Sequence, residues 1–109
     1  MNSHGLREAD WSVIREEIRN QPNVQKVILY GSRAKGTEKK GSDVDLALIG
    51  PGVNRSVLVE LSMRLNEETP LPYRFDLVDY QSIDNAALRE HIDRVGILVY
   101  EKGGPEGPP

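Results

Sequence analysis

Two aspartates flank a valine at the point where a run of apolar residues begins. Asp43 and Asp45 are separated by Val44, and the apolar residues that follow predict a strand ending at Ile49. Because successive side chains of a strand point to opposite faces, both carboxylates lie on one face, roughly 6 to 7 Å apart along the strand. Two like charges in this arrangement repel each other unless a cation or water screens them. Mg²⁺ prefers such oxygen ligands, although an isolated Asp-x-Asp is also compatible with a solvated strand end.

A Gly-Ser pair upstream favours the metal-binding interpretation. Gly31 and Ser32 directly follow the apolar segment 24–30, and ten residues separate them from Asp43. A glycine lets the backbone approach a phosphate closely, and the Ser32 amide and hydroxyl can donate hydrogen bonds to phosphate oxygens. The pattern G-S-x10-D-x-D, placed between two predicted strands, therefore indicates a site for a nucleotide phosphate chain and a divalent cation.

The surrounding sequence predicts the elements that position this motif. Strands that alternate with helices indicate an α/β (α+β) layered domain, although the order and direction of the strands do not follow from the pattern. Ser82 or Asp84 is the expected cap of the last helix. Hydrophobic periodicity predicts helices over 6–20, 32–35, 56–68 and 82–94, and strands over 24–30, 44–49, 73–79 and 96–100.

Length and composition limit the other possibilities. The 109 residues carry a formal net charge of −3 and contain no cysteine, so one domain without disulfides or zinc–thiolate sites is expected. The acidic balance and scattered basic residues give no reason to expect nucleic acid as a partner. No apolar run approaches membrane-spanning length, and a cytoplasmic location is the default expectation. Residues 1–102 are predicted to form the domain, and the Gly/Pro-rich residues 103–109 a disordered tail.

The stretch YGSRAKGTEKKGSDVDLAL, residues 30–48, resembles the signature of the DNA polymerase β-type nucleotidyltransferase superfamily. It is most similar to the minimal nucleotidyltransferases (MNT), small prokaryotic proteins often paired with a helical HEPN partner, and the similarity covers about residues 24–102. The resemblance implies a nucleotidyltransferase fold with a mixed sheet of about four strands flanked by helices. It also implies that Gly31 and Ser32 bind a nucleoside triphosphate and that Asp43 and Asp45 hold Mg²⁺.

The resemblance further implies a third carboxylate on a neighbouring strand, which completes the metal site and helps to activate the attacking hydroxyl. Asp76 is the candidate, because it lies mid-strand between apolar residues, where an unpaired charge is costly. Asp79 is the rival, but its position at the strand end also suits a surface or capping residue. The predicted catalytic and metal-binding residues are thus Asp43, Asp45 and Asp76.

Basic residues close to the motif could neutralise phosphate charge. Arg33 and Lys35 follow the Gly-Ser pair and could contact the triphosphate, or they could belong to a solvated turn. Arg33 is included among the predicted nucleotide-binding residues, with Gly31 and Ser32. Arg74 precedes Asp76 by two residues and could orient a carboxylate or a phosphate. Lys39 and Lys40 are expected in an exposed loop, and no role is assigned to His4 or His91.

These features together predict Mg²⁺-dependent transfer of NMP, with AMP from ATP as the expected case, to a hydroxyl acceptor. The resemblance implies that the acceptor is a side chain such as tyrosine on a HEPN partner, and that the chain is an antitoxin. A homo- or hetero-oligomer is expected, because one small domain cannot by itself cover the nucleotide. Two other classes stay open: a non-catalytic nucleotide-binding regulatory subunit, and a nucleotidyltransferase for an antibiotic or another small molecule.

Overall fold

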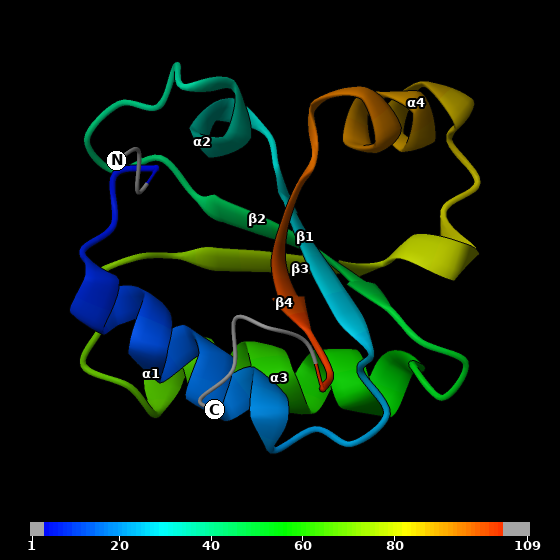
Figure 1. Cartoon of the computed structure of the whole chain (residues 1–109), viewed down its shortest axis with the longest axis horizontal. Helices are drawn as coiled ribbons and strands as arrows, with labels where there is room; N and C mark the ends of the chain where they lie inside the picture. Colours follow the sequence, from blue (N-terminus) through cyan, green and yellow to red (C-terminus); the bar gives the residue numbers. More distant parts are fainter. Residues whose placement is uncertain (1–3, 104–109) are drawn as a thin grey trace.

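The computed structural model describes residues 4–103, which form a four-stranded sheet with helices on both faces (Figure 1). The strand order is β3-β2-β1-β4, with β1 antiparallel to both β2 and β4, and with β2 parallel to β3. The sheet is therefore mixed, as predicted, and β3 and β4 are its edges. The elements are α1 (Glu8–Arg19), β1 (Lys26–Tyr30), α2 (Ser32–Lys35), β2 (Val44–Ile49), α3 (Arg55–Glu67), β3 (Phe75–Asp79), the 3₁₀ helix η1 (Tyr80–Ser82), α4 (Ala86–Val95) and β4 (Ile97–Glu101).

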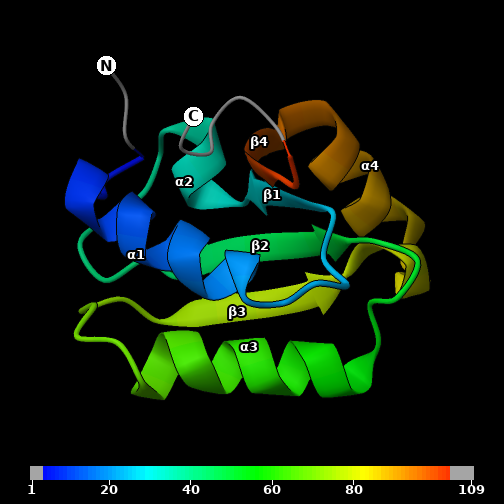
Figure 2. The same cartoon turned by 60° about the horizontal axis from the view of Figure 1, so that its bottom comes forward.

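The core lies between the sheet and the two long helices α1 and α3. These helices cover one face of the sheet, and α2 and α4 lie on the other (Figures 1 and 2). Val44, Leu46 and Leu48 alternate along β2 and point into this core, where they are fully buried. A smaller apolar cluster of Tyr30, Ala47 and Ile92 joins α4 to the opposite face. The residues of β2 that alternate with Val44, Leu46 and Leu48 lie on this second face, and Asp45 is one of them.

The predicted elements are present, and the largest difference lies before α4. The helix expected over 82–94 begins only at Ala86, and a 3₁₀ turn precedes it. Asn85 caps the helix by accepting a hydrogen bond from the Leu88 amide at 3.1 Å, so the cap is neither Ser82 nor Asp84. The other elements begin and end within about two residues of the expected positions, which is the usual uncertainty at their ends.

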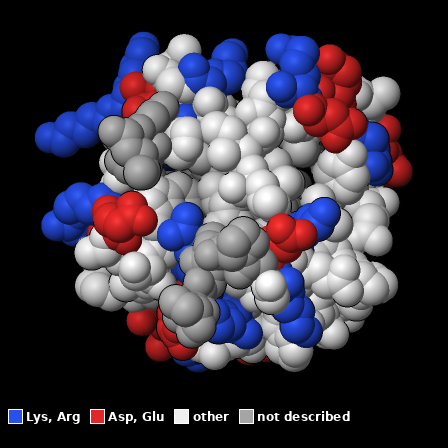
Figure 3. Space-filling view, viewed as in Figure 1, with Lys and Arg blue, Asp and Glu red and all other residues white. Residues whose placement is uncertain are grey.

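The edge of the sheet at β4 faces the viewer in Figure 1. In the matching space-filling view, the surface between α2 and α4 is formed by uncharged side chains, with charged side chains around it (Figure 3). Leu98 on β4 is 49% exposed. Within residues 4–103, no helix is long and apolar enough to cross a membrane. Of the predicted tail, residues 104–109 lie outside the described residues.

Candidate active site

The three predicted carboxylates lie on the face of the sheet that carries α2 and α4. Asp45 is the central one, because its Cα faces Tyr30 on β1 and Asp76 on β3 in the register of the sheet. Asp43 immediately precedes β2 and, two residues from Asp45, shares its side of the strand. Val44 between them points the opposite way into the core. The pairing of β2 with β3 thus brings together carboxylates that the whole of α3 separates in sequence.

Asp45 is the carboxyl group most affected by its surroundings. Burial, followed by the charges of Asp76 and Asp43, raises the pKa of Asp45 to about 6, while the charge of Arg33 opposes this increase. Burial and the charges of Asp45 and Asp76 likewise raise the pKa of the Tyr30 hydroxyl. Carboxylates that repel one another in this way are stabilised by a nearby cation. The site is therefore set up electrostatically to receive positive charge.

The donor chemistry of the cluster fits a hard divalent cation. Mg²⁺ prefers oxygen ligands, and one or two carboxylates commonly hold it together with phosphate oxygens and water. Across residues 4–103, no group of three acidic or histidine side chains is arranged to hold a metal ion by itself. The candidates for holding an ion together with the phosphates of a substrate are Asp43, Asp45 and Asp76.

The Gly-Ser turn lies directly against Asp45. Gly31 follows β1 and adopts φ 78° and ψ −157°, a conformation that residues with a Cβ rarely adopt. A Cβ at this position would overlap Oδ2 of Asp45. Ser32 then begins the single-turn helix α2, in which the Lys35 amide donates to the Gly31 carbonyl at 3.1 Å. Glycine is therefore required both by the backbone angle and by the close approach of the turn to the carboxylate.

The structure adds one residue to which the sequence assigned no role. His91 lies on α4, and its Nε2 accepts a hydrogen bond from the Gly31 amide at 3.3 Å. Its ring also meets the Tyr30 ring edge-on, with the centroids 6.2 Å apart. No local sequence pattern could reveal this contact, because it depends on how α4 packs beside β1. His4, by contrast, hydrogen-bonds through Nδ1 to the Arg33 carbonyl.

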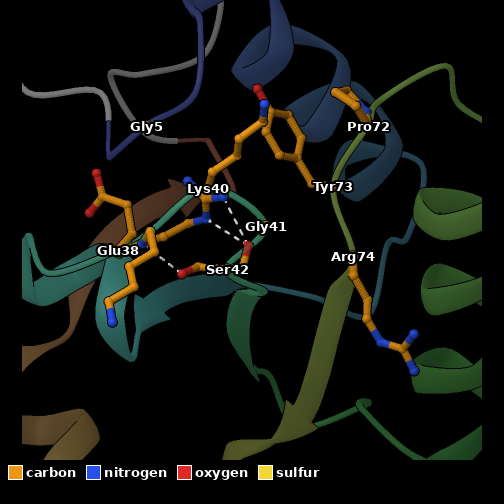
Figure 4. A pocket seen from close by; sticks show the side chains of 10 residues that line it. Gly5, Glu38, Lys40, Gly41, Ser42, Pro72, Tyr73 and Arg74 are labelled. Carbon is orange, nitrogen blue, oxygen red and sulfur yellow. Dashed lines mark hydrogen bonds between the residues drawn. The ribbon is translucent and has the colours of Figure 1, made fainter.

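The side chain of Arg33 forms hydrogen bonds within the chain, which the sequence did not predict. Its guanidinium is buried and donates to the Ser42 carbonyl at 2.8 and 3.3 Å and to the His4 carbonyl at 2.9 Å. It also lies over the Tyr73 ring, 5.3 Å from the centroid. These contacts fasten the loop before Ser42 beside the pocket of Figure 4. The charge of Arg33 also acts on Asp45, and the predicted contact of Arg33 with a phosphate stays a prediction.

Asp79, the rival of Asp76, lies at the far end of β3. Its register partner is Leu48, near the end of β2, whereas Asp76 faces Asp45 near the start. The Asp79 carboxylate accepts hydrogen bonds from the Gln81 amide at 3.2 Å and from the Ser82 hydroxyl at 2.9 Å. Asp79 therefore caps the 3₁₀ helix, and the structure places Asp76 alone beside the other two carboxylates.

A polar pocket at the β3 edge gives access to two of the three carboxylates, Asp43 and Asp76. It has a volume of about 760 Å³ and is lined by Asp43, Asp76 and Arg74, together with polar residues of α3. The Arg74 side chain points away from Ser42 and Tyr73 (Figure 4). A second molecule could thus approach Asp76 without crossing the Gly-Ser turn. The basic side chains of Lys35, Lys39 and Lys40 are exposed.

Comparisons with known sequences show the family of the chain. The family model described as polymerase beta, nucleotidyltransferase matches residues 13–103, a range that includes the carboxylates and the Gly-Ser turn. The chain is also 36% identical over 73 residues to a Haemophilus influenzae protein named probable protein adenylyltransferase MntA. That match covers 67% of this chain and 63% of the relative, so it spans less than two thirds of the relative's length.

Solved structures share the fold. A crystal structure of a toxin–antitoxin complex with AMP-PNP gives a TM-score of 0.70 at 26% identity, over 84% of this chain and 73% of the matched chain. A complex of a tri-AMPylated HEPN toxin with an MNT antitoxin from Shewanella oneidensis gives a TM-score of 0.67 at 21% identity, over 88% and 73% of the two chains, and shows the fold alone. The chain therefore belongs to the polymerase beta nucleotidyltransferase family.

Proposed function

We propose that this chain is a Mg²⁺-dependent nucleotidyltransferase that transfers NMP, with AMP from ATP as the expected case, to a hydroxyl acceptor. The observation that carries the proposal is the position of Asp45. It lies beside Asp76 in the β2–β3 pairing, and the backbone of Gly31 packs against its carboxylate. A candidate cation site and a candidate phosphate-binding turn thus meet at one side chain, which suits transfer at a phosphate.

Each candidate residue has a distinct part in the proposed reaction. The Gly31 turn and the amide and hydroxyl of Ser32 would hold the triphosphate, and Asp43, Asp45 and Asp76 would hold Mg²⁺. When bound, the ion would supply positive charge that neutralises phosphate charge. Asp76 is exposed beside the polar pocket, where its carboxylate can accept the proton of an acceptor hydroxyl. The hydroxyl oxygen then bonds to the α-phosphorus in line, the bond to the bridging oxygen breaks, and pyrophosphate leaves.

The relatives indicate which acceptor to test. One is named a probable protein adenylyltransferase, and the solved complexes join a toxin to an antitoxin, one of them with AMP-PNP and another with an AMPylated HEPN toxin. We propose that the partner of this chain is likewise a helical HEPN-type protein, that a hydroxyl side chain such as tyrosine receives AMP, and that the chain acts as an antitoxin. Because the reaction consumes ATP and neutralises a toxin, the cytoplasm is the proposed location.

Transfer of label from [α-³²P]ATP tests this proposal. The chain is incubated with ATP, Mg²⁺ and a HEPN-type protein from the same organism, and label on that protein is followed by autoradiography and intact mass spectrometry. We expect label with the unmodified chain and with Asp79→Asn, the matched capping control, and no label with Asp45→Asn. Binding of ATP without any label on the partner would instead favour a non-catalytic regulatory subunit. Failure to bind ATP and Mg²⁺ would rule the proposal out.

A further inference from the structure

His91 is held beside the Gly-Ser turn by the packing of α4. The next residue, Ile92, is 2% exposed and packs against Tyr30 and Ala47 on the sheet. One turn earlier, the Arg89 guanidinium donates to two carbonyls of the preceding segment at 3.1 and 3.0 Å, which fastens the start of the helix. The imidazole of His91 is thus placed by a packed helix and not by a loop.

The contact between His91 and Gly31 has a defined direction. The Gly31 amide is the donor, so Nε2 of His91 is the acceptor and the ring proton lies on Nδ1. The Tyr30 ring meets the imidazole nearly perpendicular to it, at an interplanar angle of 80°, which restricts the orientation of the imidazole. His91 therefore presents an oriented acceptor to one particular peptide group.

A hydrogen bond to the Gly31 amide strongly restricts the backbone conformation of the Gly-Ser turn. Glycine has the greatest backbone freedom, because it has no Cβ. Here it is held at φ 78° with its Cα against the Asp45 carboxylate, while His91 binds its amide. Ser32 follows immediately. Rotation of the peptide group between Tyr30 and Gly31 would therefore move Ser32 relative to Asp45.

We propose that His91 is a positioning residue for nucleotide binding. By accepting the Gly31 amide hydrogen bond, it holds the Gly31–Ser32 turn in the place beside Asp45 where the turn meets the triphosphate. His91 acts through Gly31 and does not touch the reacting atoms. The inference rests on the proposed function, because that function supplies the nucleotide. The hydrogen bond itself does not depend on a nucleotide. Helix α4, which carries no candidate catalytic residue, thereby becomes part of the nucleotide site.

Substitutions on α4 separate the hydrogen bond from the packing of the ring. His91→Gln retains a side-chain acceptor of similar reach but loses the edge-on contact with Tyr30, and His91→Ala loses both. Glu90→Gln is the matched control, because Glu90 is an exposed neighbour on the same helix that pairs with Arg94. Both His91 variants lose the ring, so we expect similar, small decreases in their Tm. A difference in ATP affinity between the two His91 variants then measures the effect of the side-chain hydrogen-bond acceptor.

Calorimetric titration of each full-length variant with ATP and Mg²⁺ supplies the dissociation constants. We expect His91→Ala to weaken ATP binding by about five- to tenfold, the effect of losing one hydrogen bond. We expect His91→Gln to stay within about twofold of the unmodified chain and Glu90→Gln to match it. In the transfer assay, the same pattern should appear in KM for ATP, with kcat little changed. Equal weakening in the two His91 variants, or unchanged binding in His91→Ala, would overturn the proposal.

An NMR measurement without nucleotide keeps this test separate from that of the proposed function. A long-range ¹H–¹⁵N correlation spectrum should show the His91 proton on Nδ1, and the Gly31 amide signal should move further in His91→Ala than in His91→Gln. A proton on Nε2 would contradict the hydrogen bond and overturn the inference. If the spectrum agrees but the unmodified chain binds no ATP, the proposed function fails, and the role of His91 in nucleotide binding fails with it.

Discussion

Asp45 and Asp76 face each other across the parallel pairing of β2 and β3, with helix α3 between them in the sequence. Because the two strands run in the same direction and are in register, their carboxylates lie at the same end of the sheet. The charge of Asp76 contributes to the raised pKa of Asp45. The pair is therefore unfavourable for the cation-free fold and favourable for binding a cation.

The metal-free chain should become less stable as the pH rises through the titration of Asp45. Its folded pKa of about 6 lies above the ordinary unfolded value near 3.9, so the folded state binds the additional proton between these pH values. Its contribution to stability is complete below about pH 4 and is lost as the pH passes about 6. We expect Asp45→Asn to be more stable than the unmodified chain by about 1–2 kcal/mol near pH 7.5, after allowing for screening by water.

Urea unfolding of both chains with a chelator, at about pH 4.5 and about pH 7.5, measures this difference. The advantage of Asp45→Asn should be small at the lower pH, because Asp45 is then largely protonated in the unmodified chain. Mg²⁺ with ATP should reduce or reverse it at the higher pH, since the bound ion favours the carboxylate. An advantage of the same size at both pH values would show that repulsion among the carboxylates is not its cause.

Asp76→Asn should separate nucleotide binding from transfer. Asp43 and Asp45 remain to hold the ion, so ATP binding should weaken by no more than about tenfold, whereas transfer of AMP should fall by at least about a hundredfold if Asp76 accepts the proton. Asp79→Asn is the comparison, because Asp79 only caps the 3₁₀ helix through Gln81 and Ser82. It should keep full activity and lose less than about 1 kcal/mol of stability. Equal losses of activity in the two variants would contradict the assignment of Asp76.

Gly31→Ala should damage the site more than its size suggests. The new Cβ would overlap Oδ2 of Asp45 in a backbone conformation, φ 78°, that alanine rarely adopts. We expect a loss of about 1–3 kcal/mol in the free energy of unfolding and at least about a tenfold weaker binding of ATP. Gly36→Ala is the matched control, since Gly36 also has a positive φ of 79° but its Cβ would meet nothing within 4 Å. If Gly36→Ala weakened ATP binding equally, the close approach to Asp45 would not be the cause.

Arg33→Lys should act mainly on stability. Lysine keeps the charge but cannot reproduce the hydrogen bonds that the guanidinium donates to the carbonyls of Ser42 and His4. We expect a loss of about 1–3 kcal/mol, measured by urea unfolding, because buried carbonyls lose their donors. Lys35→Ala, at an exposed position of the same helix, should change stability by less than about 0.5 kcal/mol. Arg33→Lys with unchanged stability and weaker ATP binding would support a phosphate contact instead.

The parts of this protein that the sequence determined are local ones. The apolar run before Gly31 predicted β1, and the alternation after Asp43 predicted that Asp43 and Asp45 share a face opposite Val44. The structure confirms the burial of Val44 in the core. Such features follow from residue type and from the period of a strand, which involve neighbours along the chain.

The tertiary structure decided everything that depends on segments distant in sequence. The pairing of β2 with β3 placed Asp76 beside Asp45, and the 3₁₀ turn gave Asp79 a capping role. The same packing buried the Arg33 side chain and brought His91 to the Gly31 amide. Strand order and helix position result from burying apolar surface on both faces of the sheet at once. These contacts join segments that are distant in sequence. Strand order, helix position and the placement of the polar side chains therefore cannot be predicted from a local pattern of residues.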